Sequence, residues 1–135
     1  MSSTTIKSEV RTINAPIQKV FDFICDFNNI KELLPEDKIS DWKSTNDDCS
    51  FKVQNAATIP LIKESVAAPT KINIVSGDNA PFPFTLQVIL TDKGENTEGY
   101  LHFEGEINAF LKMMVVTPLT NLFNYMGKKL EEKFA

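Results

Sequence analysis

The sequence contains few of the residues that catalytic and metal sites are built from. Its 135 residues include one histidine, two cysteines and five glycines. Because Cys25 and Cys49 lie far from each other and from His102, no metal-ligand spacing and no pairing of a nucleophile with a base is recognisable. A glycine-rich phosphate loop is also missing. We therefore predict no metal and no cofactor.

Long apolar segments and clusters of positive charge are missing as well. The longest apolar run, Met113 to Val116, is far shorter than the roughly 20 residues that cross a bilayer, and Met1 to Lys7 lacks the apolar core of a secretory signal. The net charge is −4 and the basic residues are scattered, which argues against a nucleic-acid partner. We expect a cytoplasmic protein with reduced cysteines and no transmembrane segment. The oligomeric state has no signature in the sequence.

The composition that remains is typical of one globular domain spanning residues 1–135. Hydrophobic residues make up 42% of the chain and charged residues 24%. Ten phenylalanines stand against one tryptophan and two tyrosines. Phenylalanine supplies large apolar area without a polar group, so it suits either a dense core or the wall of an apolar pocket.

Hydrophobic periodicity divides the chain into strand, helix, strands and helix. Residues 4–13 alternate as in a half-buried strand, with Ile6 and Val10 on the apolar face, and residues 16–27 then repeat at helical spacing. A further helical turn follows at 30–34, and Pro35 ends it. Short connections between the later strands predict an antiparallel meander. These strands are expected at residues 39–44, 49–55, 61–68, 71–76, 84–92 and 97–107.

The last segment, residues 118–134, is predicted to be one long amphipathic helix, with Thr117 as its cap and Pro118 in its first turn. Residues 110–116 are expected to form a preceding helical segment bent at Pro118. As alternatives, the methionines of that segment form a movable rim or touch a membrane. The fold class is therefore α+β: a curved antiparallel sheet of about six to seven strands wrapped around a long C-terminal helix, with two short helices after the first strand.

Several short motifs resemble the opening signature of the START-like (SRPBCC) superfamily, whose architecture is the helix-grip fold. They are Ile-Asn-Ala-Pro at 13–16, Val-Phe-Asp-Phe-Ile at 20–24, Asp26, and Leu-Leu-Pro at 33–35. The spacing is most similar to the branch that contains polyketide cyclases and the G-type component of carbon monoxide dehydrogenase, although the glycine that usually follows the proline is Glu36 here. The resemblance implies an apolar cavity between sheet and C-terminal helix, used for lipids, sterols, polyketides or other hydrophobic molecules.

Two polar residues are in phase with apolar faces and are candidates to orient a ligand inside this cavity. Glu64 is in phase with Ile62 and Val66, and Asn55 with Phe51 and Val53. Unpaired polar groups are costly to bury, so inward ones mark functional positions. The alternative is a bulge or strand end that turns each side chain outward. The full set expected to line the cavity is Trp42, Phe51, Val53, Asn55, Ile62, Glu64, Phe84, Leu86, Val88, Leu101, Phe103, Leu119, Leu122, Phe123 and Met126.

Three functions are compatible with this interpretation. The first is binding or transport of a small hydrophobic or amphipathic molecule, such as a lipid or a polyketide. The second is a cyclase- or aromatase-like enzyme that uses the same cavity, with Glu64 as its acid or base. The third is a protein-interaction or maturation module with a vestigial pocket. The single histidine, His102, alternates with Leu101 and Phe103 and is expected on the outer surface of its strand.

Overall fold

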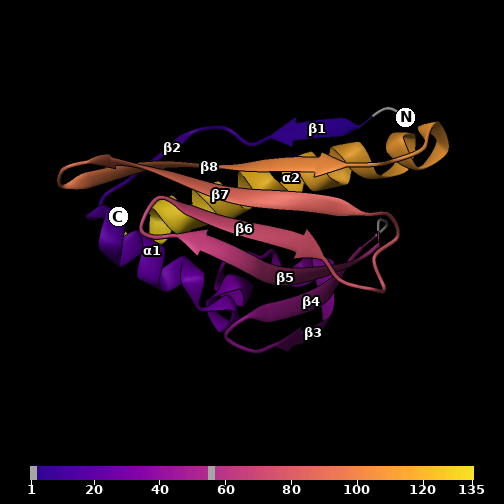
Figure 1. The fold of residues 1–135 in the computed structure, drawn as a ribbon, viewed down its shortest axis with the longest axis horizontal. Helices are drawn as coiled ribbons and strands as arrows, with labels where there is room; N and C mark the ends of the chain where they lie inside the picture. Colours follow the sequence, from indigo (N-terminus) through magenta and orange to yellow (C-terminus); the bar gives the residue numbers. More distant parts are fainter. Residues whose placement is uncertain (1–2, 55–56) are drawn as a thin grey trace.

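The computed structural model describes residues 3–54 and 57–135. One curved antiparallel sheet in the order β1-β8-β7-β6-β5-β4-β3, with β2 also paired to β8, carries the long helix α2 behind it (Figure 1). The predicted α+β architecture is confirmed. In chain order the elements are β1 (Thr4–Lys7), β2 (Arg11–Ile13), α1 (Ile17–Cys25), the 3-10 segments η1 (Phe27–Leu33) and η2 (Glu36–Lys38), β3 (Ile39–Ser44), β4 (Asp48–Val53), β5 (Thr58–Ala67), β6 (Lys71–Ser76), β7 (Phe84–Lys93), β8 (Asn96–Gly105) and α2 (Ala109–Lys133).

The first predicted strand is interrupted by a bulge. Lys7 pairs with His102 and Arg11 with Gly99, so three residues, 8–10, lie opposite two, 100–101. Ser8 turns inward at this point, donating its N–H to the Leu101 carbonyl at 2.9 Å and accepting the Leu101 N–H on Oγ at 2.8 Å. The prediction that Val10 shares the buried face of Ile6 is therefore wrong, and Val10 is half exposed.

The buried side chains of β5 are out of phase with the predicted inner face, and a bulge interrupts the strand further along. Ile62 and Val66, expected inside, are 41% and 44% exposed, and Glu64 is exposed as well. The buried residues before them are Ile59 and Leu61, and the register shifts between Lys63 and Ser65. Ile62 precedes this shift and points outward because it alternates with the buried Leu61, whereas Glu64 is the extra residue of the bulge. The interpretation of Glu64 as an inward carboxylate is wrong, and the alternative of a bulge is confirmed.

Helix α2 begins nine residues before Pro118 rather than beside it. Asn108, not Thr117, is its cap: Asn108 Oδ1 accepts the Leu111 N–H at 2.9 Å, and Pro118 lies inside the helix. Proline in a helix interior removes one backbone hydrogen bond. Thr120 Oγ1 donates to the Val116 carbonyl, at 2.7 Å, in the turn around this proline. The predicted helical conformation of residues 110–116 is confirmed.

Contacts distant in sequence hold the second half of α2. Lys133 Nζ lies 2.7 Å from Glu32 Oε1, and the Phe134 ring packs edge-on against Phe23 with centroids 5.9 Å apart. The Glu9 N–H donates to Asn124 Oδ1 at 2.9 Å. The η1 segment, α1 and the bulge after β1 therefore all fix the same half of the helix.

The revised helix start gives a test of the cap. Replacing Asn108 with Ala removes the acceptor of the Leu111 N–H, and we expect the free energy of unfolding to fall by about 1 kcal/mol. Thr117→Ala, which alters an exposed side chain within the helix, is the control and should change stability by less than about 0.5 kcal/mol. Urea unfolding followed by circular dichroism measures both. A larger effect of Thr117→Ala would instead favour a helix that begins at Pro118.

Candidate functional site

An apolar cavity lies between the inner face of the sheet and the second half of α2. Its volume is about 50 Å³. Aliphatic side chains from the sheet, from α1 and η1, and from α2 make most of the wall, and backbone at Gly99 and Gly127 completes it. The lining residues are Ser8, Arg11, Ile13, Ile24, Ile30, Leu33, Leu61, Ile74, Leu86, Val88, Leu90, Gly99, Tyr100, Leu101, Met126, Gly127 and Leu130.

Phenylalanine rings fill one half of the interior, whereas the half lined by aliphatic side chains contains the cavity. Phe103 packs on Phe84 and Phe123 with ring centroids 5.3 and 5.6 Å apart, and Phe82 adds an edge-on contact to Phe103 at 6.3 Å. These large rings occupy the space below the middle of α2. Further along the same helix the neighbours are smaller aliphatic side chains, and the cavity lies among them. Side-chain volume thus decides where the interior stays open.

Arg11 is the polar group that distinguishes the cavity wall. Its Nη2 lies 3.2 Å from Glu9 Oε1 and its Nη1 lies 3.7 Å from Glu131 Oε1, so the outer guanidinium is paired near the surface. Its Nε is buried and, among the described atoms, has no hydrogen-bond partner. Gly127 lets α2 pass close to the Arg11 side chain, since a Cβ added there would lie 3.3 Å from Arg11 Cγ. The Ser8 hydroxyl already accepts the Leu101 N–H.

A second hollow opens on the surface between η2, the end of β4 and the middle of α2. This groove has a volume of about 560 Å³ and a mixed polar and apolar lining. Val53 and Leu122 form its apolar floor, and Asp37, Lys38 and Asn121 are among its polar residues.

The structure brings only some of the predicted site residues to the cavity. Leu86, Val88, Leu101 and Met126 line it. Val53 and Leu122 face the groove instead. The remaining buried residues of the predicted set belong to the packed core and do not border the cavity: they are Phe51, Phe84, Phe103, Leu119 and Phe123.

Three predicted residues lie elsewhere. Trp42 stacks on Phe51 with ring centroids 6.1 Å apart, on the β3 side of the sheet. Ile62 and Glu64 are exposed: Ile62 alternates with the buried Leu61, and Glu64 is the extra residue of the bulge in β5. Asn55 lies outside the described residues, so its orientation stays a prediction.

Sequence reasoning misses Arg11 because a bulge that leaves no mark in the sequence brings it to the cavity wall, and it misses Ser8 although Ser8 is in phase with Ile6 on the predicted inner face. Helical spacing places Ile24 and Leu130 on buried faces, but nothing in a helical stripe separates core from cavity wall. The glycines at positions 99 and 127, which face aliphatic side chains, are the one sequence signal for the position of the cavity.

Other candidate chemistry is sparse. His102 is on the outer face, as predicted, with its ring Nε2 3.1 Å from Glu104 Oε1. Within residues 3–54 and 57–135, no group of three or more His, Cys, Asp or Glu side chains is placed to hold a metal ion. The same part of the chain contains no helix long and apolar enough to span a membrane.

Comparison with known proteins supports the fold but not a family by sequence. No family model matches the sequence, and no curated protein matches it. Among solved structures, the KanY protein is 14% identical with a TM-score of 0.76, covering 99% of each chain. A START superfamily protein from Mycobacterium smegmatis is 12% identical with a TM-score of 0.70, covering 96% of each chain. XoxI from Bacillus cereus is 19% identical, with a TM-score of 0.66, covering 99% of this chain and 96% of that one. The chain therefore has the START-like fold that its motifs resemble.

The buried thiol of Cys49 allows a test of the packing beside this site. Burial, with a smaller contribution from the Asp48 carboxylate, raises the pKa of Cys49 from 9.0 to about 12. Between these values the unfolded chain loses the thiol proton while the folded chain keeps it, so stability falls as the pH rises above 9. We expect urea unfolding from about pH 8 to pH 10.5 to show a decline of up to about 1.4 kcal/mol per pH unit that Cys49→Ala removes. An unchanged slope in that variant would mean that Cys49 is accessible in the folded state.

Proposed function

We propose that the protein binds a small hydrophobic or amphipathic molecule in the cavity between the sheet and α2. The observation that carries this proposal is the wall itself: aliphatic side chains surround a space that the neighbouring phenylalanines leave unfilled. Apolar walls with a few convergent polar groups are typical of small-molecule sites. The START-like fold supports the same interpretation, because the resemblance implies an apolar cavity between the sheet and the C-terminal helix.

The volume of the cavity either limits the ligand to a small size or requires side chains of the wall to move. About 50 Å³ is far below the roughly 300–1,000 Å³ of sites for drug-sized molecules. A molecule of a few heavy atoms fits without rearrangement, whereas a longer one displaces wall side chains. Met126 is the wall residue best suited to move, since its unbranched side chain has three rotatable bonds. Binding of a longer ligand is therefore accompanied by a new Met126 rotamer.

Arg11 supplies the polar preference of the site. Its buried Nε–H lacks a partner among the described atoms, and a ligand oxygen in the cavity would accept that hydrogen bond. The ligand is accordingly an amphiphile with a carboxylate, carbonyl or hydroxyl oxygen at the Arg11 end. Arg11 takes the orienting role that the sequence suggests for Glu64.

A second candidate is the interaction module with a vestigial pocket. The small volume and the solid packing of Phe84, Phe103 and Phe123 favour it. The cyclase-like alternative loses its acid or base, because Glu64 faces outward and no carboxylate belongs to the described cavity wall. Ligand retention separates the two remaining functions.

Filling the cavity tests ligand binding directly. Val88→Phe places a ring in the open half of the interior, and we expect native mass spectrometry of gently purified protein to show a bound small molecule in the wild type and none in the variant. Glu64→Gln is the matched control on the same sheet and should retain the molecule. Thermal unfolding confirms that Val88→Phe still folds, since overpacking costs about 1–3 kcal/mol. A wild type that never carries a ligand would support the interaction module.

The role of Arg11 is tested with octanoate as a probe. Arg11→Met keeps the aliphatic stem but removes the N–H groups, and we expect octanoate to bind about tenfold more weakly, as measured by isothermal titration. Glu131→Gln weakens an ion pair of Arg11 without touching Nε and should leave the affinity within about twofold. Equal losses in both variants would show that Arg11 acts only through its surface ion pairs.

A further inference from the structure

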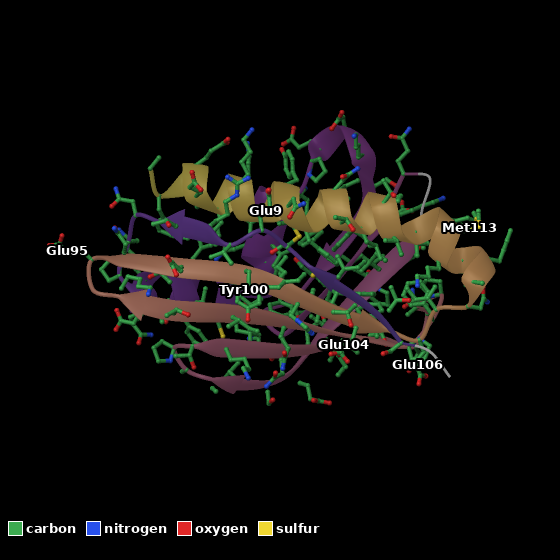
Figure 2. All side chains as sticks on the ribbon, turned by 90° about the horizontal axis from the view of Figure 1, so that it is seen from above. Glu9, Glu95, Tyr100, Glu104, Glu106 and Met113 are labelled. Atoms are coloured by element: carbon green, nitrogen blue, oxygen red, sulfur yellow. The ribbon has the colours of Figure 1, made fainter. Side chains whose placement is uncertain are left out.

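Three large apolar side chains are exposed together at the start of α2. Phe110, Met113 and Met114 are 69%, 88% and 48% exposed. Their spacing of three and four residues places them on one side of the helix. The start of α2 lies at one end of the longest axis of the molecule (Figure 1). Figure 2 shows Met113 on the outside of that end, with Glu95 at the other end of the molecule. We refer to these three side chains as the α2 tip.

We propose that the α2 tip inserts into the interfacial layer of an electroneutral phospholipid bilayer. Contiguous exposed apolar side chains on the surface of a domain mark an interaction site. The three side chains expose on the order of 400 Å², about half of the roughly 800 Å² that each partner buries in a stable protein complex. The tip is thus too small for a lasting contact with a second copy or another protein. It is sufficient for reversible insertion of a few side chains into lipid.

A side-chain cap satisfies one N–H group in the first turn of α2, at the tip. Asn108 Oδ1 accepts the Leu111 N–H at 2.9 Å, and the Lys112 N–H donates to the Asn108 carbonyl at 2.9 Å. Because each free N–H group in a first turn opposes contact with lipid, the cap lowers the cost of inserting the tip. Lys112 itself is exposed, and its long side chain can keep its ammonium among the headgroups while the tip inserts.

The charges near the α2 tip point to neutral rather than anionic lipid. Lys112 is the basic residue of this part of the helix, and the exposed carboxylate of Glu106 lies shortly before Asn108. The chain as a whole has a net charge of −4. Binding to anionic surfaces depends on several clustered basic residues, each contributing about 1 kcal/mol. The apolar side chains therefore supply the attraction.

The position of the α2 tip relates it to the rest of the molecule without depending on the cavity. The groove begins at Thr117 and Pro118, about one turn after Met113 and Met114. A bilayer that holds the tip consequently lies close to the groove. Docking itself needs no bound ligand, so loss of ligand binding in Val88→Phe and loss of docking are separate results.

Flotation with vesicles tests the docking. The full chain is mixed with 100 nm phosphatidylcholine vesicles and separated on a density gradient. We expect the wild type to float and the double variant Phe110→Glu, Met113→Glu to float at least tenfold less. The matched control Ile62→Glu, Val66→Glu changes two exposed apolar residues of β5 and should float like the wild type. Adding phosphatidylserine should not increase the bound fraction.

A spectroscopic variant and a measurement of mass complete the test. In the Phe110→Trp variant, the fluorescence of the introduced indole should shift to shorter wavelength when vesicles are added, because the indole leaves water. Light scattering during gel filtration should give the molecular mass of a monomer. Absence of flotation, flotation that survives the double variant, or a dimer that the double variant dissolves would each overturn the proposal. The last result would assign the tip to contact between copies of the chain.

Discussion

The structure depends on one packing contact: the buried stripe of α2 against the inner face of the sheet. Phe123 lies on Phe103, and Leu119 beside them is among the most completely buried side chains. Because α2 comes last in the chain while its neighbours include β1, β2, η1 and β8, elements from both ends of the preceding chain must be in place before the helix can bury its stripe. Such non-local contacts make the interior a single cooperative unit.

This contact leaves the two ends of α2 in different situations. The second half is fixed by Lys133 with Glu32, by Phe134 with Phe23, and by Asn124 with the backbone of Glu9. The first turns have no comparable set of side-chain contacts among the described residues and expose three large apolar residues. The half that is held covers the cavity, and the half that is exposed leads to the groove. Our two proposals therefore place ligand binding and contact with a lipid surface at opposite ends of one helix.

The sequence predicts the fold well because periodicity survives over long elements. The stripe at Leu119, Phe123 and Met126 identifies α2, and the alternation of β7 and β8 identifies the inner face of the sheet. Prediction fails where strand pairing, rather than the pattern of the strand itself, decides which side chains face the core. The bulge after Lys7 moves Val10 off the buried face, and pairing buries Ile59 and Leu61 of β5 rather than the predicted Ile62; neither effect has a sequence signal such as glycine. Pro118 is ambiguous for a different reason: proline is tolerated in a first turn, and here the helix continues through it.

The candidate site is harder to predict than the fold because hydrophobicity does not distinguish a filled interior from an open one. Leu101 and Phe103 are two residues apart on β8 and face the same side, yet one borders the cavity and the other closes the core. The two side chains differ in volume, and whether each one fills the interior depends on the residues packed against it. Phe103 meets the large ring of Phe123, whereas Leu101 shares its surroundings with Gly127 and Met126. The open space is a property of these facing pairs, which only the three-dimensional register defines. The same register brings Arg11 to the cavity wall. The bulge after β1 therefore breaks the alternation expected from the sequence and also gives the cavity its polar end.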